Sequence, residues 1–327
     1  MARNIRVTGG AGYIGSVVVE QLLARGETPI VLDDLSTGHR AAVPAGVEFI
    51  RGNVGDRTVL DALFAGRSID ALMHFAAFAL VAESVADPAK YHANNVTAGR
   101  VLLETAVAAG VRRVIFSSSC TIYGARGAEP ITEDAPVAPL NPYGETKAEF
   151  EALLARLAER DGLESVSLRY FNAAGATARY GEDHEPETHL IPNALRVAQG
   201  RAPTLEVYGA DYPTADGTAI RDYIHVLDLA DAHIRALDAA LNGAVAVNLG
   251  TGAGHSVLAV VAAARHVTGH AIPTVVAPRR SGDPSCLVAA RGRAERLLDW
   301  RPTHSSLEEI LSSAWDWHRA HPRGYRN

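Results

Sequence analysis

Cysteine is scarce in this sequence, with Cys120 and Cys286 as its two examples among 327 residues. Two thiols so far apart are too few for the disulfide framework of a small secreted protein, and the residues around them do not complete a zinc site. The sequence therefore predicts a reduced, intracellular protein without a bound metal.

Basic residues are too few and too scattered for nucleic-acid binding. Lys and Arg number 31 against 37 Asp and Glu, which gives a formal net charge of −6. Affinity for a phosphate backbone comes largely from clustered Lys and Arg, and the sequence has no such cluster. A small anionic ligand remains open, because its pocket needs only a few local arginines.

Long apolar runs are also missing. No stretch approaches the ~20 apolar residues that a membrane span requires. The N-terminal residues enter a strand-like run at once, with neither the apolar region nor the cleavage site of a signal peptide. We therefore expect a cytoplasmic protein that has no membrane partner.

The chain does contain enough apolar material for a large core. Hydrophobic residues make up 47% and charged residues 21% of the sequence, as in ordinary globular proteins. Short apolar runs alternate with helical patterns and are apolar enough to be buried on both faces, which predicts an α/β fold with a Rossmann-type doubly wound parallel sheet. The predicted strands lie within 5–10, 28–34, 47–53, 70–77, 112–119 and 164–172, and the helices within 16–25, 57–65, 94–109 and from 143 onward.

This alternation ends near residue 175. From there Gly, Pro and charged residues interrupt shorter elements, which predicts a smaller C-terminal α/β lobe over 176–327 beside a first domain over 1–175. A strand and helix pattern near 219–250 could pack back on the sheet. The two units are therefore expected to be interleaved.

Three glycines follow the first predicted strand and precede a helix. Gly9, Gly12 and Gly15 are spaced three residues apart. Such a turn needs glycine because the backbone must approach a pyrophosphate, and the helix N-terminus then offers unpaired N–H groups to the phosphates. In this strand–loop–helix context the spacing predicts a dinucleotide site.

Two carboxylates, Asp33 and Asp34, end the second apolar run. A carboxylate there can accept hydrogen bonds from the ribose hydroxyls of NAD and would repel the 2′-phosphate of NADP, so NAD is favoured. A loop cap is the alternative role, and it suits Asp34 better.

Tyr143 and Lys147 lie four residues apart, directly after the Asn-Pro pair at 141–142. On a helix this spacing puts the phenol and the ammonium on one face. The cation would favour the phenolate and let Tyr143 act as a base nearer neutral pH. A simple surface pair is the alternative.

These motifs together resemble the UDP-glucose 4-epimerase family within the extended short-chain dehydrogenase/reductase superfamily. The resemblance covers nearly the whole chain and keeps the family's order of segments. The matching segments are the glycine loop, 117–124 (SSSCTIYG), 141–147 (NPYGETK), 168–175 (LRYFNAAG), 188–192 (THLIP), 207–233, 248–257 (NLGTGAGHSV) and 278–285 (PRRSGDPS).

The resemblance implies reversible 4-epimerisation of UDP-galactose and UDP-glucose through a transient 4-keto sugar, with tightly held NAD. Tyr143 would be the base, Lys147 would hold the phenolate and the nicotinamide ribose, and Ser119 would hydrogen-bond the reacting oxygen. It implies a role in galactose metabolism and a homodimer formed through the helices at 94–109 and 143–159. Residues 1–175 would be the NAD-binding Rossmann domain and 176–327 the UDP-sugar-binding lobe.

The resemblance also implies one set of contacts to NAD and another to the UDP-sugar. For Phe75 and Phe171 core packing is the alternative role, and for at least one of the serines at 117–119 the alternative is a polar strand end. The contacts to NAD would come from Gly9, Gly12, Tyr13, Ile14, Gly15, Asp33, Asp34, Asn53, Val54, Phe75, Ala76, Asn95, Ser117, Tyr143, Lys147 and Phe171. Those to the UDP-sugar would come from Ser119, Tyr143, Asn172, His189, Leu190, Glu206, Val207, Tyr208, Arg221, Arg280, Asp283 and Leu287.

Four positions depart from the family's pattern. Asn53 stands where several members have Asp facing the adenine, and Ala79 where some have Lys near the pyrophosphate, which leaves less positive charge at NAD. His189 replaces a common Asn. Leu287 stands where relatives carry Tyr or Cys, so acceptance of N-acetylated UDP-sugars is open.

Other functions on the same scaffold are alternatives. Nucleotide-sugar dehydratases and UDP-glucuronate decarboxylases carry carboxylates where Cys120 and Thr121 stand here, and without them elimination lacks its acid. A non-enzymatic NAD sensor would not require the pair of Tyr143 and Lys147.

Overall fold

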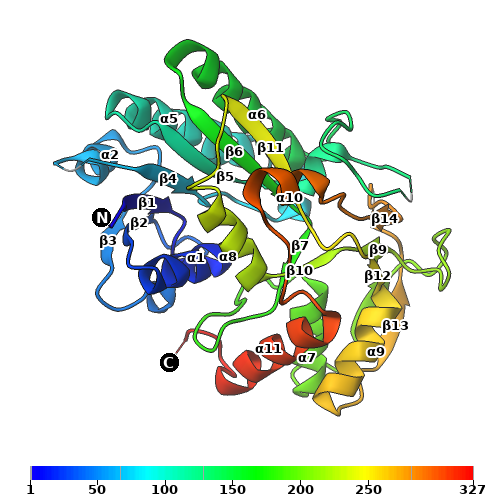
Figure 1. Cartoon of the computed structure of the whole chain (residues 1–327). Coiled ribbons are helices and arrows are strands. Elements are labelled where there is room, and N and C mark those ends of the chain that lie inside the picture. The colour runs from blue at the N-terminus through cyan, green and yellow to red at the C-terminus, as the bar shows by residue number, and fades with distance from the viewer. Residues whose placement is uncertain (1, 67, 128, 281, 327) are drawn as a thin grey trace.

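A seven-stranded sheet lies at the centre of the computed structural model, which describes residues 2–66, 68–127, 129–280 and 282–326 (Figure 1). All its strands are parallel, in the order β11-β6-β5-β4-β1-β2-β3. The predicted Rossmann-type doubly wound sheet is therefore confirmed. Its strands are β1 (Asn4–Thr8), β2 (Thr28–Asp33), β3 (Glu48–Arg51), β4 (Ala71–His74), β5 (Arg113–Ser119), β6 (Glu164–Tyr170) and β11 (Ala244–Leu249).

Helices cover both faces of this sheet. On one face α1 (Tyr13–Ala24) and α8 (Val226–Arg235) pack side by side, and on the other lie α2 (Arg57–Phe64), α5 (Gly99–Ala108) and α6 (Pro142–Asp161) (Figure 1). Strand residues alternate between the two cores, because successive side chains point to opposite faces. Val7, Val31 and Met73 pack with Val18 and Leu22, whereas Leu32, Leu72 and Val114 pack with Leu60, Leu102 and Phe150.

Shorter elements connect the strands. They are η1 (Arg40–Ala42), α3 (Val81–Ala86), α4 (Pro88–His92), the π-helical turn η2 (Ala93–Ala98) and η3 (Cys120–Tyr123). The predicted helix at 94–109 is thus a π-helical turn that continues into α5. The helix predicted from Ser16 begins at Tyr13, because Gly12 is its N-cap. No helix of the described ranges is long and apolar enough to cross a bilayer.

A separate core lies beyond the sheet, where α7, α9 and α11 pack around Leu195, Val260 and Ile310. Short strand pairs lie beside it, whereas β11 returns to pair with β6. The division at residue 175 stays a prediction. The remaining elements are β7 (Asn172–Ala174), α7 (Leu190–Ala198), β8 (Leu205–Tyr208), β9 (Ile220–Arg221), β10 (Tyr223–His225), β12 (His255–Ser256), α9 (Val257–Thr268), β13 (Thr274–Ala277), β14 (Cys286–Leu287), α10 (Gly292–Leu298) and α11 (Leu307–Ala320).

A buried polar network joins α6 to the sheet. Glu151 accepts hydrogen bonds from Ser118 at 2.5 Å and from Arg169 Nε at 3.0 Å. Arg169 also donates to Tyr123 Oη at 2.8 Å, and Tyr123 donates to Asn248 of β11 at 2.7 Å. Buried charges are tolerated when they are paired and hydrogen-bonded in this way.

His74 predicts how stability depends on pH. The side chain is 2% exposed between Phe116 and Phe150, and burial lowers its pKa to about 3. Below pH ~6.5 the histidine is protonated in the unfolded chain but stays neutral in the folded chain. The free energy of unfolding therefore decreases as the pH is lowered. We expect the free energy of unfolding of the wild type, relative to His74→Gln, to drop by about 2 kcal/mol between pH 7 and pH 5.

Urea denaturation at the two pH values measures this difference. His266→Gln, on the exposed side of α9, is the control and should follow the wild type. Parallel pH profiles for the wild type and His74→Gln would contradict the prediction.

Candidate active site

The glycine turn connects β1 to α1 at the carboxyl edge of the sheet. Gly9 has a φ of +75°, and a Cβ atom on it would lie 2.4 Å from the backbone nitrogen of Ala76, just beyond β4. A Cβ atom on Gly15 would lie 2.2 Å from the carbonyl oxygen of Gly9. The N-cap residue of α1 is Gly12, and no side chain forms a capping hydrogen bond there. The first backbone N–H groups of α1 can therefore bind an anion.

The two carboxylates after β2 have different partners. Asp33 accepts hydrogen bonds from the backbone N–H groups of Ala11 at 3.0 Å and Leu35 at 2.9 Å, and burial raises its pKa. Asp34 accepts from Asn53 Nδ2 at 3.0 Å and from the Ser36 N–H at 2.9 Å. Burial alone would raise the pKa of Asp34, but these hydrogen bonds lower it. The structure thus brings the predicted NAD residues of β1, β2 and β3 together.

Lys147 lies at the same carboxyl edge of the sheet, beside the end of β5 rather than β1. Its side chain is 3% exposed, and Nζ donates to the carbonyl oxygen of Ser117 at 2.7 Å. Asn141 caps α6 by accepting from the Gly144 N–H at 2.9 Å, which starts the helix so that Tyr143 and Lys147 fall on one face. Nζ lies 5.7 Å from the ring centroid of Tyr143. The predicted i, i+4 pair is therefore formed, with Lys147 buried and Tyr143 half-buried.

The expected low pKa of Tyr143 is wrong for this structure. Burial raises the pKa of the phenol to about 12, although a hydrogen bond with Ser119 acts in the opposite direction. Burial also lowers the pKa of Lys147 to about 7, so the ammonium is a weaker source of charge than a solvated lysine. The i, i+4 spacing predicts where the cation lies but not how desolvation changes the pKa values of the two groups.

The remaining predicted NAD residues have protein partners of their own. Asn95 accepts from the Phe78 N–H at 2.9 Å and donates to Thr146 at 3.1 Å, so it fixes the loop after β4. Phe75 packs against the His233 ring at 4.8 Å, and Ser117 hydrogen-bonds Tyr170. The Tyr13 hydroxyl donates to Gly175 at 2.6 Å, whereas Val54 and Phe171 are buried in cores and Ile14 packs against one.

The predicted substrate residues form two small groups. Arg221 forms an ion pair with Asp283, and the Arg280 guanidinium lies 4.0 Å from the ring centroid of Tyr208, whose hydroxyl donates to Glu206. Arg221 thus lies at the end of β9, and Arg280 lies beside the end of β8. Of the others, Asn172 donates to the Asp222 carbonyl at 3.0 Å, Val207 is buried, and Leu287 packs in one cluster with Cys120 and Phe171.

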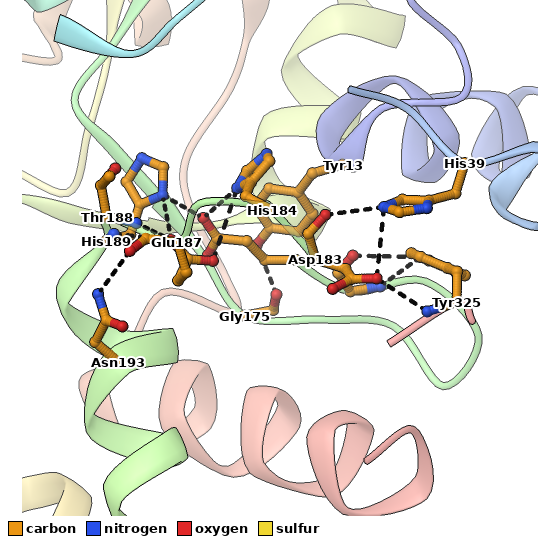
Figure 2. A network of polar contacts seen from close by, with 12 residues as sticks. Tyr13, His39, Gly175, Asp183, His184, Glu187, Thr188, His189, Asn193 and Tyr325 are labelled. Atoms are coloured by element: carbon orange, nitrogen blue, oxygen red, sulfur yellow. Dashed lines mark hydrogen bonds and ion pairs between the residues drawn. The ribbon is translucent and has the colours of Figure 1, made fainter. Parts of the chain in front are cut away.

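His189, expected to line the sugar pocket, faces two carboxylates. Its Nδ1 lies 2.7 Å from Glu182 and 3.0 Å from Glu187, and Leu190 begins α7 directly after it (Figure 2). Desolvation disfavours the protonated imidazole and lowers its pKa, but the two carboxylates outweigh this effect and raise the pKa of His189 to about 10. Sequence reasoning missed these partners and also missed Glu151 and Tyr170, which flank the lysine and serine of the site.

The fold and this site define a dinucleotide-binding α/β protein with a Ser–Tyr–Lys cluster at the carboxyl edge of its sheet. The chain belongs to the NAD dependent epimerase/dehydratase family, whose model matches residues 5–250. It is 49% identical to the UDP-glucose 4-epimerase of Streptomyces lividans, with 99% of each chain covered.

Two solved structures have the same fold. The UDP-glucose 4-epimerase of Brucella ovis in complex with NAD matches with a TM-score of 0.92 and 45% identity, over 96% of this chain and 98% of that one. The UDP-glucose 4-epimerase of Bifidobacterium longum in complex with NAD⁺ and UDP matches with a TM-score of 0.94 and 37% identity, over 98% of this chain and 99% of that one. The predicted family is therefore confirmed.

Asp33→Ala tests the cofactor side of the site. Loss of this carboxylate removes the acceptor for the Ala11 N–H and the predicted ribose partner, so we expect NAD affinity to fall by about 10- to 100-fold. Isothermal titration of cofactor-stripped protein with NAD measures the change. Asp70→Ala, which removes an exposed carboxylate at the amino end of β4, is the control, and equal affinities of the two variants would refute the assignment.

Proposed function

We propose that this protein catalyses the reversible 4-epimerisation of UDP-galactose and UDP-glucose with NAD as its bound cofactor. The observation that carries the proposal is the pair of half-buried Tyr143 and buried Lys147, beside Ser119 and at the same edge of the sheet as the glycine turn. The full-length similarity to a UDP-glucose 4-epimerase supports the same substrate class.

The residues around the glycine turn fit a dinucleotide. Gly9 and Gly15 leave no room for a Cβ atom, the N-terminus of α1 is uncapped by side chains, and Asp33 stands at the end of β2. When bound, NAD supplies a nicotinamide ring that can accept and return a hydride. Asp33 favours the ribose hydroxyls of NAD over a 2′-phosphate.

In this proposal Tyr143 takes the proton of the sugar 4-hydroxyl while the hydrogen on C4 leaves as a hydride, which bound NAD would accept and later return. The substrate thereby becomes a transient 4-keto sugar. A phenol with a pKa of about 12 is a poor base at neutral pH, so it needs positive charge nearby and a donor for its anion. Lys147 supplies the charge, and the nearby Glu151 carboxylate partly restores the pKa that burial lowers. Ser119 supplies a hydroxyl next to the phenol.

The sugar nucleotide would lie between this edge and the smaller lobe. Arg221 and Arg280 are the proposed partners of the diphosphate, with Asp283 at the ribose and Glu206 to Tyr208 at the uracil. Guanidinium groups suit such a role because they bind phosphate oxygens in a fork. Arg221 is largely buried and held by Asp283, which orients it in advance.

Cys120 and Thr121 support epimerisation over dehydration or decarboxylation. Burial raises the pKa of the Cys120 thiol to about 12, and Thr121 Oγ1 donates to Ser119 at 3.0 Å. Neither side chain is an acid that could protonate a leaving group at neutral pH.

The wider setting is proposed on family resemblance. We place the protein in the cytoplasm, in galactose metabolism, as a homodimer formed through α5 and α6. The apolar stripe of α6, which includes Phe150, Leu154 and Leu157, is buried in the chain's own core. A dimer would therefore have to use the outer faces of these helices.

Tyr143→Phe tests the proposed base. We expect kcat for interconversion of UDP-galactose and UDP-glucose to fall by about 10²- to 10⁴-fold, because the general base is lost while the ring remains. Chromatography of the two UDP-sugars measures the rate. Tyr180→Phe, a buried tyrosine outside the site, should keep wild-type activity, and a wild type with bound NAD but no turnover would reject the proposed function.

Leu287→Ala tests the alternative of N-acetylated substrates. Leu287 packs in one cluster with Phe171 and Cys120, so a smaller side chain should make room near the sugar. We expect the ratio of kcat/KM for UDP-N-acetylgalactosamine to that for UDP-galactose to rise by about 10-fold. Leu163→Ala, a buried leucine just before β6, is the control, and an unchanged ratio in Leu287→Ala would show that this position does not limit sugar size.

A further inference from the structure

Four potential metal ligands meet in the connection between β7 and α7. Glu182, His184, Glu187 and His189 each offer one ligand atom, and these atoms all lie within 4.8 Å of one another. Figure 2 shows His184, Glu187 and His189 close together, just before the first residue of α7. The sequence spacing Glu-x-His-x-x-Glu-x-His brings both residue types from one short segment.

The two carboxylates are buried, and histidines rather than lysines or arginines lie beside them. The Glu182 and Glu187 side chains are 6% and 3% exposed. In the part of the chain that the structure describes, neither forms an ion pair with a lysine or an arginine; their charged partners are the two imidazoles. Burial of two carboxylates side by side is costly unless positive charge lies between or beside them.

The two imidazoles turn the same nitrogen toward these carboxylates. His189 Nδ1 lies 2.7 Å and 3.0 Å from oxygens of Glu182 and Glu187, and His184 Nδ1 lies 3.3 Å and 3.8 Å from oxygens of the same two residues. His184 Nδ1 is buried and has no hydrogen bond within the described residues, because its contacts do not have hydrogen-bond geometry. A buried ring nitrogen without a hydrogen-bond partner needs an explanation, and an ion bound beside the two carboxylates would supply one.

We propose that these four side chains bind one divalent transition-metal ion of the zinc type. Two carboxylates and two neutral imidazoles carry two negative charges, which a divalent cation neutralises. Two nitrogens and two oxygens are ligands that Zn²⁺ takes, and a tetrahedral site with bonds of about 2.0–2.1 Å has ligands about 3.3 Å apart. The four histidine–glutamate separations, 2.7–3.8 Å, bracket that value, and all the ligand atoms lie within 4.8 Å of one another.

The ion would have a structural role. Four protein ligands leave no open position for a substrate, as in closed zinc sites. His184 packs edge-on against Tyr13, the first residue of α1, with ring centroids 6.4 Å apart, and His189 is the N-cap residue of α7. A metal here would therefore fix the start of α7 relative to the cofactor loop. The cysteine count that predicted no metal site overlooked this segment.

Tag-free protein, stripped with a chelator and titrated with Zn²⁺ against a chromophoric competitor, tests the proposal. We expect one zinc per chain, a higher melting temperature with zinc, and intense visible absorption of tetrahedral type with Co²⁺. His184→Gln and Glu182→Gln should each weaken zinc binding by at least about 100-fold. His304→Gln, which removes a half-exposed imidazole paired with Glu309, is the control and should bind like the wild type.

Two results would overturn the proposal. One is a wild type that binds no zinc and does not change its melting temperature, which would leave protonated histidines as the partners of the carboxylates. The other is zinc binding of wild-type affinity in both variants, which would place the ion elsewhere. Should one variant fail to fold, the other variant and the wild-type titration still decide.

Discussion

The hydrogen bond from Lys147 Nζ to the carbonyl oxygen of Ser117 is the interaction on which the catalytic edge depends. It ties the first turns of α6 to the end of β5, and Tyr143 is thereby held beside Ser119. The protonated form of Lys147 is disfavoured in this position, because burial lowers the pKa of the side chain to about 7. Active sites commonly keep such unfavourably placed charges, because a solvated cation would not act on a nearby phenol.

Local patterns predicted the parts of the molecule that local chemistry determines. Six of the seven strands of the sheet, the glycine turn, and the helix with Tyr143 and Lys147 follow from periodicity, turn residues and an N-cap. Gly9 is an example, because its positive φ and its contact with Ala76 exclude other residues. The pKa of Tyr143 was predicted in the wrong direction, since it depends on how completely the whole fold buries the phenol.

Features that join distant segments could not be predicted from residue patterns. The network from Glu151 through Arg169 and Tyr123 to Asn248 links four elements. The short strands β9, β12 and β14 have two residues each, too few for a periodic signal. Even the local set from Glu182 to His189 was overlooked, because composition does not reveal which carboxylates lose contact with water.

The return of β11 to the edge of the sheet has a consequence for biosynthesis. Because β11 follows the smaller lobe's first elements, a ribosome has completed β6 long before residues 244–249 emerge. During that interval the backbone N–H and C=O groups of β6 form an open edge, which other chains can pair with. The edge of β6 can therefore be covered by β11 only after about three quarters of the chain have been translated.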